Sequence, residues 1–380
     1  MTQASPARQA TSLFLERFGS GPAVLVSAPG RVNLLGEHTD YNGGPVLPVA
    51  LERRTVVGAG HADRWRAVSA QDGMVVEVSP DRMEQGSWTA YLIGVLRALG
   101  RTGLTLPGAD VAVASSVPIG AGLSSSAALT VALARALTGL AGKKVSAEAL
   151  VDIAWQAEHD EVGVACGRMD QTVAALARPG HALLFETGTG AITHVPYEGR
   201  IWLFQTGVSH RLTGGQLNQR RQECEVALGL CREQGIDAEA LADIGVEQLP
   251  RLLRALPVPW SQRLRHVVTE TDRTRRAAGA LAARDLPLLG RLLVEGHESL
   301  RQDYQSSCPE ADLLVESAVR HGAWGARLTG AGWGGAVLGL LPPEKEARIV
   351  AEVQEEFRLR FGQMPEVWAT KAGGGVRSEK

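Results

Sequence analysis

Apolar residues in the first third of the chain come in short runs, broken by glycine, asparagine, aspartate or proline. Short runs rich in β-branched residues predict strands. The predicted strands cover 23–28, 31–36, 45–51, 54–60, 65–70, 74–79 and 110–116, and a helix over 88–100 interrupts them. A second helix, over 124–140, has Arg135 as its only charged residue and is therefore expected to be buried on nearly all sides. A third helix is predicted over 146–162.

The pattern changes near residue 200 to longer amphipathic helices, which are predicted over 216–233, 260–302 and 309–320. Strands are predicted between and after them, over 201–207, 325–330, 336–341 and 366–372. A chain of 380 residues can bury two cores. We therefore expect two domains, 1–195 and 196–380, with a cleft between them.

The composition favours a small-molecule partner. A net charge of −2 gives no electrostatic footprint for nucleic acid or an acidic membrane surface. The four cysteines show no spacing typical of a zinc site or a disulfide framework. No apolar run has the length of a signal peptide or a bilayer span. We expect a cytoplasmic protein that binds neither membrane nor nucleic acid.

A glycine turn leads into the buried helix, with the sequence PIGAGLSSSAAL at 118–129. Gly120 and Gly122 allow a sharp turn and close approach to a ligand, and the serines follow where a helix leaves its first N–H groups unpaired. Such a helix start binds anions. The simpler interpretation is a serine N-cap after a turn. Three consecutive serines on an otherwise apolar helix favour phosphate, although the segment fits neither a Walker loop nor a dinucleotide loop.

Two carboxylates follow this loop in the sequence. Glu158 falls on the apolar stripe of the 146–162 helix, where it either reaches solvent, pairs with an arginine, or serves as a ligand for the Mg²⁺ that accompanies a nucleotide. Asp170 lies in the first turn of the helix that begins in CGRMDQTVAALA, where an acid often does no more than satisfy the helix start. Phosphoryl transfer, however, needs a carboxylate for the acceptor hydroxyl and a fixed cation for the developing charge.

Two further segments concentrate unusual residues. Residues 28–44, APGRVNLLGEHTDYNGG, gather an arginine, two acids and a histidine between turn-forming residues. Residues 328–340, LTGAGWGGAVLGL, hold more glycines than a tight turn requires and permit close backbone approach to a ligand across the cleft.

Taken together and in this order, GRVNLLGEHTDYNGG, GAGLSSSAAL, CGRMDQ and LTGAGWGG resemble the galactokinases of the GHMP small-molecule kinase superfamily. The resemblance extends over nearly the whole chain and includes SHRLTGGQLNQRRQECE at 209–225 and GHESLRQDYQSSCPEADLL at 296–314. It implies an α+β fold with a ribosomal-protein-S5-like N-terminal domain, a ferredoxin-like C-terminal domain and the active site in the cleft. The last strand, about 366–372, is expected to pair back with the first domain.

The resemblance also implies a role for individual residues. Asp170 would be the catalytic carboxylate and Arg31 the group that stabilises the transition state. The sugar would be bound by Glu37, His38, Thr39, Asp40 and the backbone near Gly167. ATP would be bound by Ser69, Trp88, Gly120, Ala121, Gly122, Leu123, Ser124, Ser125 and Ser126, with Mg²⁺ on Ser126 and Glu158. The implied reaction transfers the γ-phosphoryl group of ATP to the C1 hydroxyl of galactose, and we expect a monomer.

Two positions depart from the family pattern. Leu217 stands where galactokinases usually carry a tyrosine that touches the sugar, and losing one neutral hydrogen bond weakens binding by about tenfold at most. Arg168 stands where an apolar residue is usual, so it is expected to lower the pKa of Asp170 or to accept a charged sugar. Related sugar 1-kinases acting on arabinose, a uronic acid or an N-acetylhexosamine, and an inactive sugar sensor, therefore remain alternatives.

Overall fold

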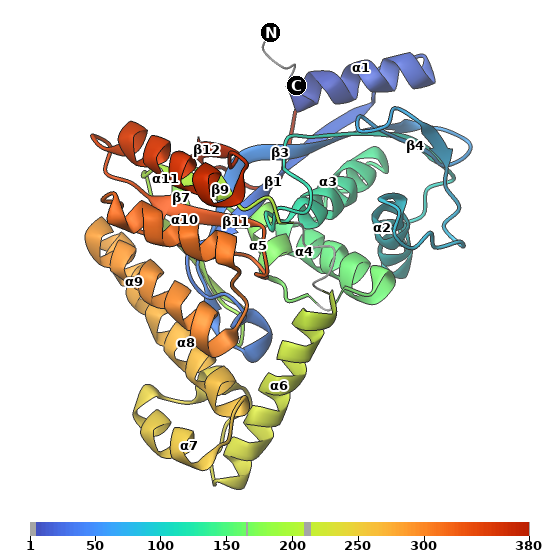
Figure 1. Cartoon of the computed structure of the whole chain (residues 1–380). Helices are drawn as coiled ribbons and strands as arrows, with labels where there is room; N and C mark the ends of the chain where they lie inside the picture. Colours follow the sequence, from blue (N-terminus) through green and yellow to red (C-terminus); the bar gives the residue numbers. More distant parts are fainter. Residues whose placement is uncertain (1–4, 165, 209–213, 380) are drawn as a thin grey trace.

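The computed structural model describes residues 5–164, 166–208 and 214–379, which form helices and strands in three sheets (Figure 1). The largest sheet has six strands in the order β13-β1-β3-β6-β4-β5, and only β4 and β6 pair in parallel. Its strands are β1 (Val24–Asn33), β3 (Pro48–His61), β4 (Arg66–Ser69), β5 (Val75–Glu77), β6 (Ala109–Ser115) and β13 (Arg377–Ser378).

Helices cover both faces of this sheet (Figure 1). One face carries α1 (Pro6–Phe18), whose Phe14 packs on Val68 and Ala112. The other face carries the larger apolar core, to which the central helix α3 contributes most of its length. The helices on this side are α2 (Thr89–Arg101), α3 (Ser125–Leu140), α4 (Ala147–Gln156), the π-helical turn η2 (Ala157–Val162) and α5 (Met169–Leu176).

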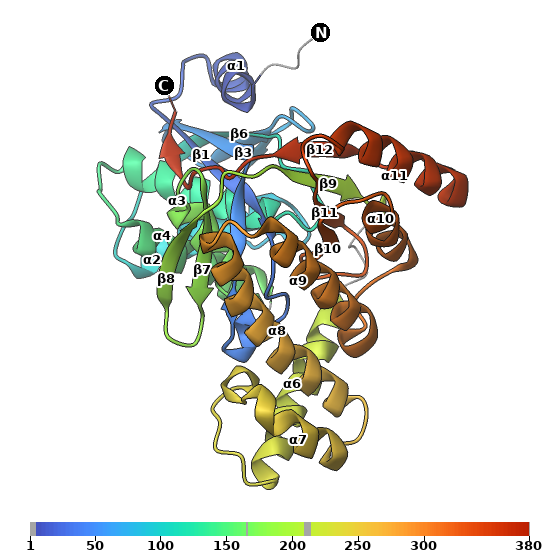
Figure 2. The same ribbon diagram turned by 90° about the vertical axis from the view of Figure 1, so that its left-hand side faces the viewer.

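A second, four-stranded antiparallel sheet has the order β10-β11-β9-β12. Its strands are β9 (Ile201–Gln205), β10 (Gly325–Thr329), β11 (Ala336–Leu340) and β12 (Val367–Thr370). Successive side chains of its strands point to opposite faces, and both faces are apolar. Val337 packs toward α10 (Pro309–Arg320) and α11 (Glu346–Phe361), and Leu338 packs toward α9 (Leu286–Ser299). Figure 2 shows α10 and α11 beside this sheet, away from α2–α4.

The remaining elements lie between the two sheets or below them in Figure 1. A small sheet is formed by β2 (Pro45–Val46), β7 (His181–Glu186) and β8 (Ala191–Pro196). The helices are α6 (Gly214–Glu233), α7 (Leu249–Ala255) and α8 (Trp260–Ala282), and the short turns are η1 (Asp40–Asn42), η4 (Leu241–Asp243), η5 (Val246–Gln248) and η6 (Leu300–Tyr304).

The structure corrects several of the predicted elements. The strands predicted over 23–28 and 31–36 are one strand, β1, and those predicted over 45–51 and 54–60 are joined in β3. The helix predicted over 260–302 is broken, because Arg284 takes a left-handed conformation and Asp285 caps a new helix with Pro287 in its first turn. The strand predicted over 366–372 does not pair with the first sheet: β12 pairs with β9, and β13, seven residues later, pairs with β1. The chain reaches β1 only after Gly373, whose N–H donates to the carbonyl of Ala50 in β3.

Candidate active site

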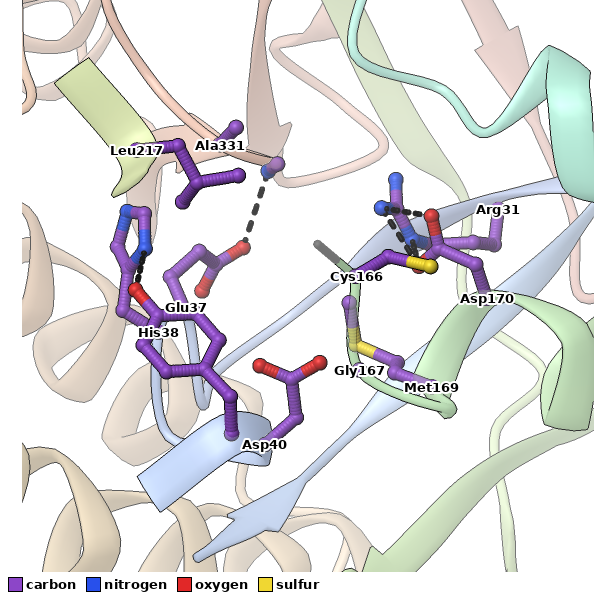
Figure 3. Close-up of a pocket in the computed structure, with 12 residues that line it drawn as sticks. Arg31, Glu37, His38, Asp40, Cys166, Gly167, Met169, Asp170, Leu217 and Ala331 are labelled. Atoms are coloured by element: carbon purple, nitrogen blue, oxygen red, sulfur yellow. Dashed lines mark hydrogen bonds and ion pairs between the residues drawn. The ribbon is translucent and has the colours of Figure 1, made fainter. Parts of the chain in front are cut away.

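A cavity of about 110 Å³ lies where the two halves of the chain meet (Figure 3). It brings together six of the predicted residues from segments far apart in the sequence. These are Arg31, Glu37, His38, Asp40, Gly167 and Asp170. The other lining residues are Tyr41, Cys166, Met169, Leu217, Gly330 and Ala331, so the second glycine-rich segment also reaches the cavity, as predicted.

Arg31 and Asp170 form a two-pronged ion pair at one end of the cavity. Arg31 on β1 donates from Nε to Asp170 Oδ1 and from Nη2 to Oδ2, both at 2.8 Å. Its third nitrogen, Nη1, donates to the carbonyl of Gly122 in the first glycine loop at 2.7 Å. This fork fixes both groups with respect to each other and to the loop.

The carboxylates at the other end of the cavity are deeply buried. Burial, together with the nearby Asp170, raises the pKa of Asp40 to about 6. Burial likewise raises the pKa of Glu37 to about 7, against the pull of Arg327, whose Nη2 lies 2.7 Å from Glu37 Oε2. These groups can accept hydrogen bonds from several hydroxyl groups, which is how proteins bind neutral sugars.

Gly167 leaves room for one of these carboxylates. A Cβ atom at this position would lie 1.9 Å from Asp40 Oδ2, so any side chain here would displace Asp40. The glycine thus allows the loop before α5 to approach the loop after β1 closely.

Two expectations do not agree with this geometry. Thr39 is not among the lining residues: its buried hydroxyl donates to the carbonyls of Gly36 and Pro45 at 2.8 and 2.7 Å, which holds the turn together. Arg168 points away from the cavity, because its guanidinium pairs with Asp152 at 2.6 Å and lies over the ring of Trp155. It therefore neither faces Asp170 nor offers a charge to a sugar.

The first glycine loop adopts the conformation that its sequence predicts. Gly120 and Gly122 both have φ +71°, and α3 begins directly after Ser124. Ser124 itself has φ +58° and makes no capping hydrogen bond, so the first N–H groups of α3 are left for another acceptor. Its hydroxyl donates to Asp170 instead. The side chains of Ala121 and Leu123 are buried, which leaves only their backbone to a ligand.

A separate cavity of about 250 Å³ lies beside the start of α3. It contains the predicted ATP-binding residues Ser69, Trp88, Ser125 and Ser126. Tyr91, Val113, Ile119 and Leu129 also line it, so aromatic and aliphatic side chains stand there beside polar ones. Such a pocket suits a planar base whose phosphates extend toward the glycine loop.

Glu158 lies buried behind Ser126. Its Oε1 accepts hydrogen bonds from Thr130 and Gln171 at 2.9 and 2.8 Å, and a further contact comes from the Ser126 hydroxyl. Burial raises the pKa of Glu158 to about 7, and within the described residues no arginine or lysine pairs with it. A buried carboxylate and a hydroxyl beside the uncapped start of α3 fit the oxygen ligands of Mg²⁺.

The side chains that support the cavity wall are not among the residues predicted from the sequence. His38 Nδ1 lies 2.7 Å from the hydroxyl of Tyr41, which lies 2.8 Å from that of Tyr304. Arg327 and Glu270 hold the segment around Glu37 from the other side. An arginine within the apolar strand 325–330 was a usable signal, because a charge there requires a buried partner. Residues 209–213, which begin one of the galactokinase-like motifs, lie outside the described residues.

Family models match much of the chain. The model described as the galactokinase galactose-binding signature matches residues 12–61. The models of the N-terminal and C-terminal domains of GHMP kinases match residues 90–178 and 277–359. Galactokinase from Chloroflexus aggregans is 41% identical over 371 residues, which cover 96% of this chain and 95% of that protein. The chain belongs to the galactokinase family.

Other galactokinases agree with this assignment. The human galactokinase is 37% identical over 365 residues, covering 92% of this chain and 91% of that protein. The structure of Lactococcus lactis galactokinase complexed with galactose superposes with a TM-score of 0.92 at 28% identity, over 97% of this chain and 98% of that one. As a galactokinase-family protein, the chain is an ATP-dependent sugar kinase.

More distant structures share the fold alone. A mevalonate kinase structure superposes with a TM-score of 0.66 at 17% identity. The predicted α+β architecture of the GHMP kinases is thereby confirmed. Among the described residues, no helix is both long and apolar enough to cross a bilayer.

Proposed function

We propose that this galactokinase-family protein transfers the γ-phosphoryl group of ATP to the C1 hydroxyl of galactose, giving galactose 1-phosphate and ADP. The Arg31–Asp170 pair carries the proposal, because it stands between the cavity with buried carboxylates and the glycine loop. A sugar in that cavity and a triphosphate on that loop would meet at these two residues.

Each part of the site has a role in this reaction. Glu37, His38 and Asp40 bind the sugar hydroxyls beside the backbone of Gly167. Asp170 orients the C1 hydroxyl and accepts its proton as the oxygen–phosphorus bond forms. The bond from the γ-phosphorus to the bridging oxygen breaks, and ADP leaves with that oxygen. Arg31 stabilises the negative charge that spreads over the transferred group.

The nucleotide is held by the first glycine loop and the pocket beside it. The backbone of residues 120–126 binds the phosphates, and Ser69 and Trp88 lie by the adenine. Thr39 is not among the residues that we propose to bind the sugar, because its hydroxyl donates to backbone carbonyls of its own turn. Ser126 and Glu158 would hold Mg²⁺, which when bound neutralises phosphate charge. No cluster of three or more His, Cys, Asp or Glu suited to a metal occurs among the described residues, so phosphate and water would complete the ion's coordination.

We also propose a monomer of two domains, 1–195 and 196–380, in the cytoplasm. Apart from β13, the six-stranded sheet comes from the first domain, and the four-stranded sheet comes from the second. Cys166, Cys224, Cys231 and Cys308 are free, which suits a reducing compartment.

Asp170→Asn tests the catalytic assignment. It keeps the shape of the side chain but removes the carboxylate, so we expect kcat to fall by about 10²–10⁴-fold with galactose and ATP. Release of ADP measures the reaction. The matched control is Arg168→Gln, two residues away, whose side chain pairs with Asp152 on the outside and which should keep near-normal kcat. Near-normal turnover of Asp170→Asn would refute the role of Asp170, and no ADP release with any sugar would favour an inactive sugar sensor.

A further inference from the structure

A buried arginine outside the sugar cavity contacts one of the proposed sugar ligands. Arg327 lies on β10, its side chain has no exposed surface, and its Nη2 is 2.7 Å from Glu37 Oε2. Glu37 faces the cavity and also accepts a hydrogen bond from the Gly330 N–H at 3.3 Å (Figure 3). One side of Glu37 is therefore offered to the sugar and the other is held by the C-terminal half of the chain.

The same arginine is held in place by a second carboxylate. Arg327 Nη1 donates to Glu270 Oε1 at 2.8 Å, and both side chains are fully buried. Glu270, on α8, accepts a further hydrogen bond from the Gly36 N–H at 2.9 Å, and its other oxygen pairs with Arg273. Glu270 thus binds both the backbone N–H of Gly36, which precedes Glu37, and the guanidinium of Arg327, which contacts Glu37.

The neighbouring helix leaves space for this arrangement. A Cβ atom at Gly296 on α9 would lie 2.4 Å from Arg327 Nη1, so this helix approaches the guanidinium closely only because the residue is glycine. The packing around Arg327 therefore allows few other positions for its side chain.

Stability alone gives a weak reason for such a network. Removing charges from water is costly, and apolar residues of similar volume often stabilise a core as well as a buried ion pair does. A fixed direction for a ligand-binding carboxylate is a benefit that an apolar core would not supply. We propose that Arg327, held by Glu270, is a positioning residue for sugar binding that fixes the Glu37 carboxylate toward the sugar hydroxyls.

This inference rests on the proposed sugar site and makes the sugar affinity depend on a residue that does not touch the sugar. Arg327→Met should raise KM for galactose by about tenfold or more, since the buried ion pair with Glu37 is lost and its carboxylate is left without that partner. KM for ATP should change less than twofold. Arg327→Lys should show a smaller rise, because an ammonium group keeps the charge but lacks the guanidinium fork that spans both carboxylates.

The pH dependence gives a readout that a merely structural role would not change. The charged or titratable side chains around Glu37 are Arg327, Glu270, Arg273, His266, Arg31, His38 and Asp40. The pKa of Glu37 is raised to about 7 by burial, and Arg327 opposes this rise. Without Arg327 the pKa of Glu37 would be higher, so the carboxylate would become fully ionised only at a higher pH. Because the ionised form accepts hydrogen bonds from the sugar, KM of Arg327→Met for galactose should keep falling from pH 7 to pH 9. KM of the unmodified protein should level off earlier.

Arg54→Met is the matched control, because Arg54 is also buried but bonds to Ser27 and to the carbonyls of Gly374 and Gly375. It should leave KM for galactose unchanged. The inference is overturned if Arg327→Met leaves KM for galactose unchanged, or if both variants raise KM for galactose and ATP alike. If Arg327→Met does not fold, Arg327→Lys decides in the same way.

Calorimetric titration with galactose separates this inference from the proposed function. It measures Kd without turnover, and Arg327→Met should weaken Kd about as much as KM. An unmodified protein that binds galactose but does not phosphorylate it would refute the proposed reaction and leave the inference to be judged on Kd. Equal Kd values for the unmodified protein and the variant would refute the inference alone.

Discussion

At the scale of single residues, three carboxylates face one small cavity and each depends on different contacts. Asp170 accepts two hydrogen bonds from the guanidinium of Arg31, and Glu37 forms an ion pair with Arg327 on its buried side. Asp40 relies on backbone N–H groups, including that of Tyr41, and burial raises its pKa to about 6. Asp40 is thus the carboxylate whose hydrogen-bonding capacity is least committed to a cation, which suits it to a sugar hydroxyl.

Gly167→Ala tests the contact between the two loops that enclose the cavity. The new Cβ would lie 1.9 Å from Asp40 Oδ2, so Asp40 must move and KM for galactose should rise by about tenfold or more. Steady-state kinetics with varied galactose measure it. Gly279→Ala on α8 is the control, because its Cβ meets no atom within 4 Å and KM should not change. An unchanged KM in Gly167→Ala would contradict the proposed place of Asp40.

Leu217→Tyr tests the departure from the family pattern. Leu217 lines the cavity, so a hydroxyl placed there can form the hydrogen bond that the leucine lacks. We expect KM for galactose to fall by up to about tenfold, corresponding to about 0.5–1.5 kcal/mol. Leu217→Phe adds the ring without the hydroxyl and should not share the gain. An equal effect of the two substitutions would show that the gain comes from ring packing.

At the scale of elements, hydrophobic periodicity predicted the apolar segments of the central strands and helices, but it divided β1 and β3 into two strands each and missed α11. The buried helix over 124–140 and the helices over 216–233 and 309–320 are present within two residues at either end. The break between α8 and α9 was marked by Asp285 and Pro287, but the apolar stripe continues on both sides. α1 was overlooked despite its Ser5 cap and Pro6 start, as were β7 and β8.

The helix α8 contributes a pH-sensitive group. His266 is fully buried between Ser299 Oγ and the carbonyl of Glu37, and burial lowers its pKa to about 4. Its pKa in the unfolded chain is near 6.5, so the unfolded state takes up a proton first. Stability is therefore complete above pH 6.5 and falls, by about 3 kcal/mol from this group, as the pH drops to 4.

His266→Gln should remove this part of the acid sensitivity. Urea unfolding at pH 7 and at pH 4.5 measures it for both proteins. The variant should be less stable at pH 7, because two buried hydrogen bonds are disturbed, and its deficit should shrink at pH 4.5. A deficit that stays constant between the two pH values would show that His266 does not titrate between them.

At the scale of the whole molecule, the site exists only where distant segments meet. The types of residue needed for phosphoryl transfer were evident from the sequence, and the family resemblance supplied their roles. Their partners could not be predicted, because contacts such as Arg327–Glu37 join residues nearly 300 positions apart and depend on how the two sheets pack. The partner of Arg168 could not be predicted either: Arg168 lies two residues from Asp170 in the sequence, but its side chain pairs with Asp152.

The two halves of the chain are also tied together away from the site. One apolar core includes Val32 and Leu34 from the first sheet's side together with Leu203, Leu289 and Leu338 from the second. The C-terminal tail returns to the first sheet, where Arg54 binds the carbonyls of Gly374 and Gly375. This shared core fixes the walls of the sugar cavity with respect to one another.

We propose that this cavity selects galactose and presents its C1 hydroxyl to ATP. The most direct test compares kcat/KM for galactose, arabinose, galacturonic acid and N-acetylgalactosamine, and locates the phosphate in the product by phosphorus–proton NMR. We expect the highest kcat/KM for galactose and a product phosphorylated at C1. A product phosphorylated at another hydroxyl, or a galactose value no higher than those of the other sugars, would contradict it.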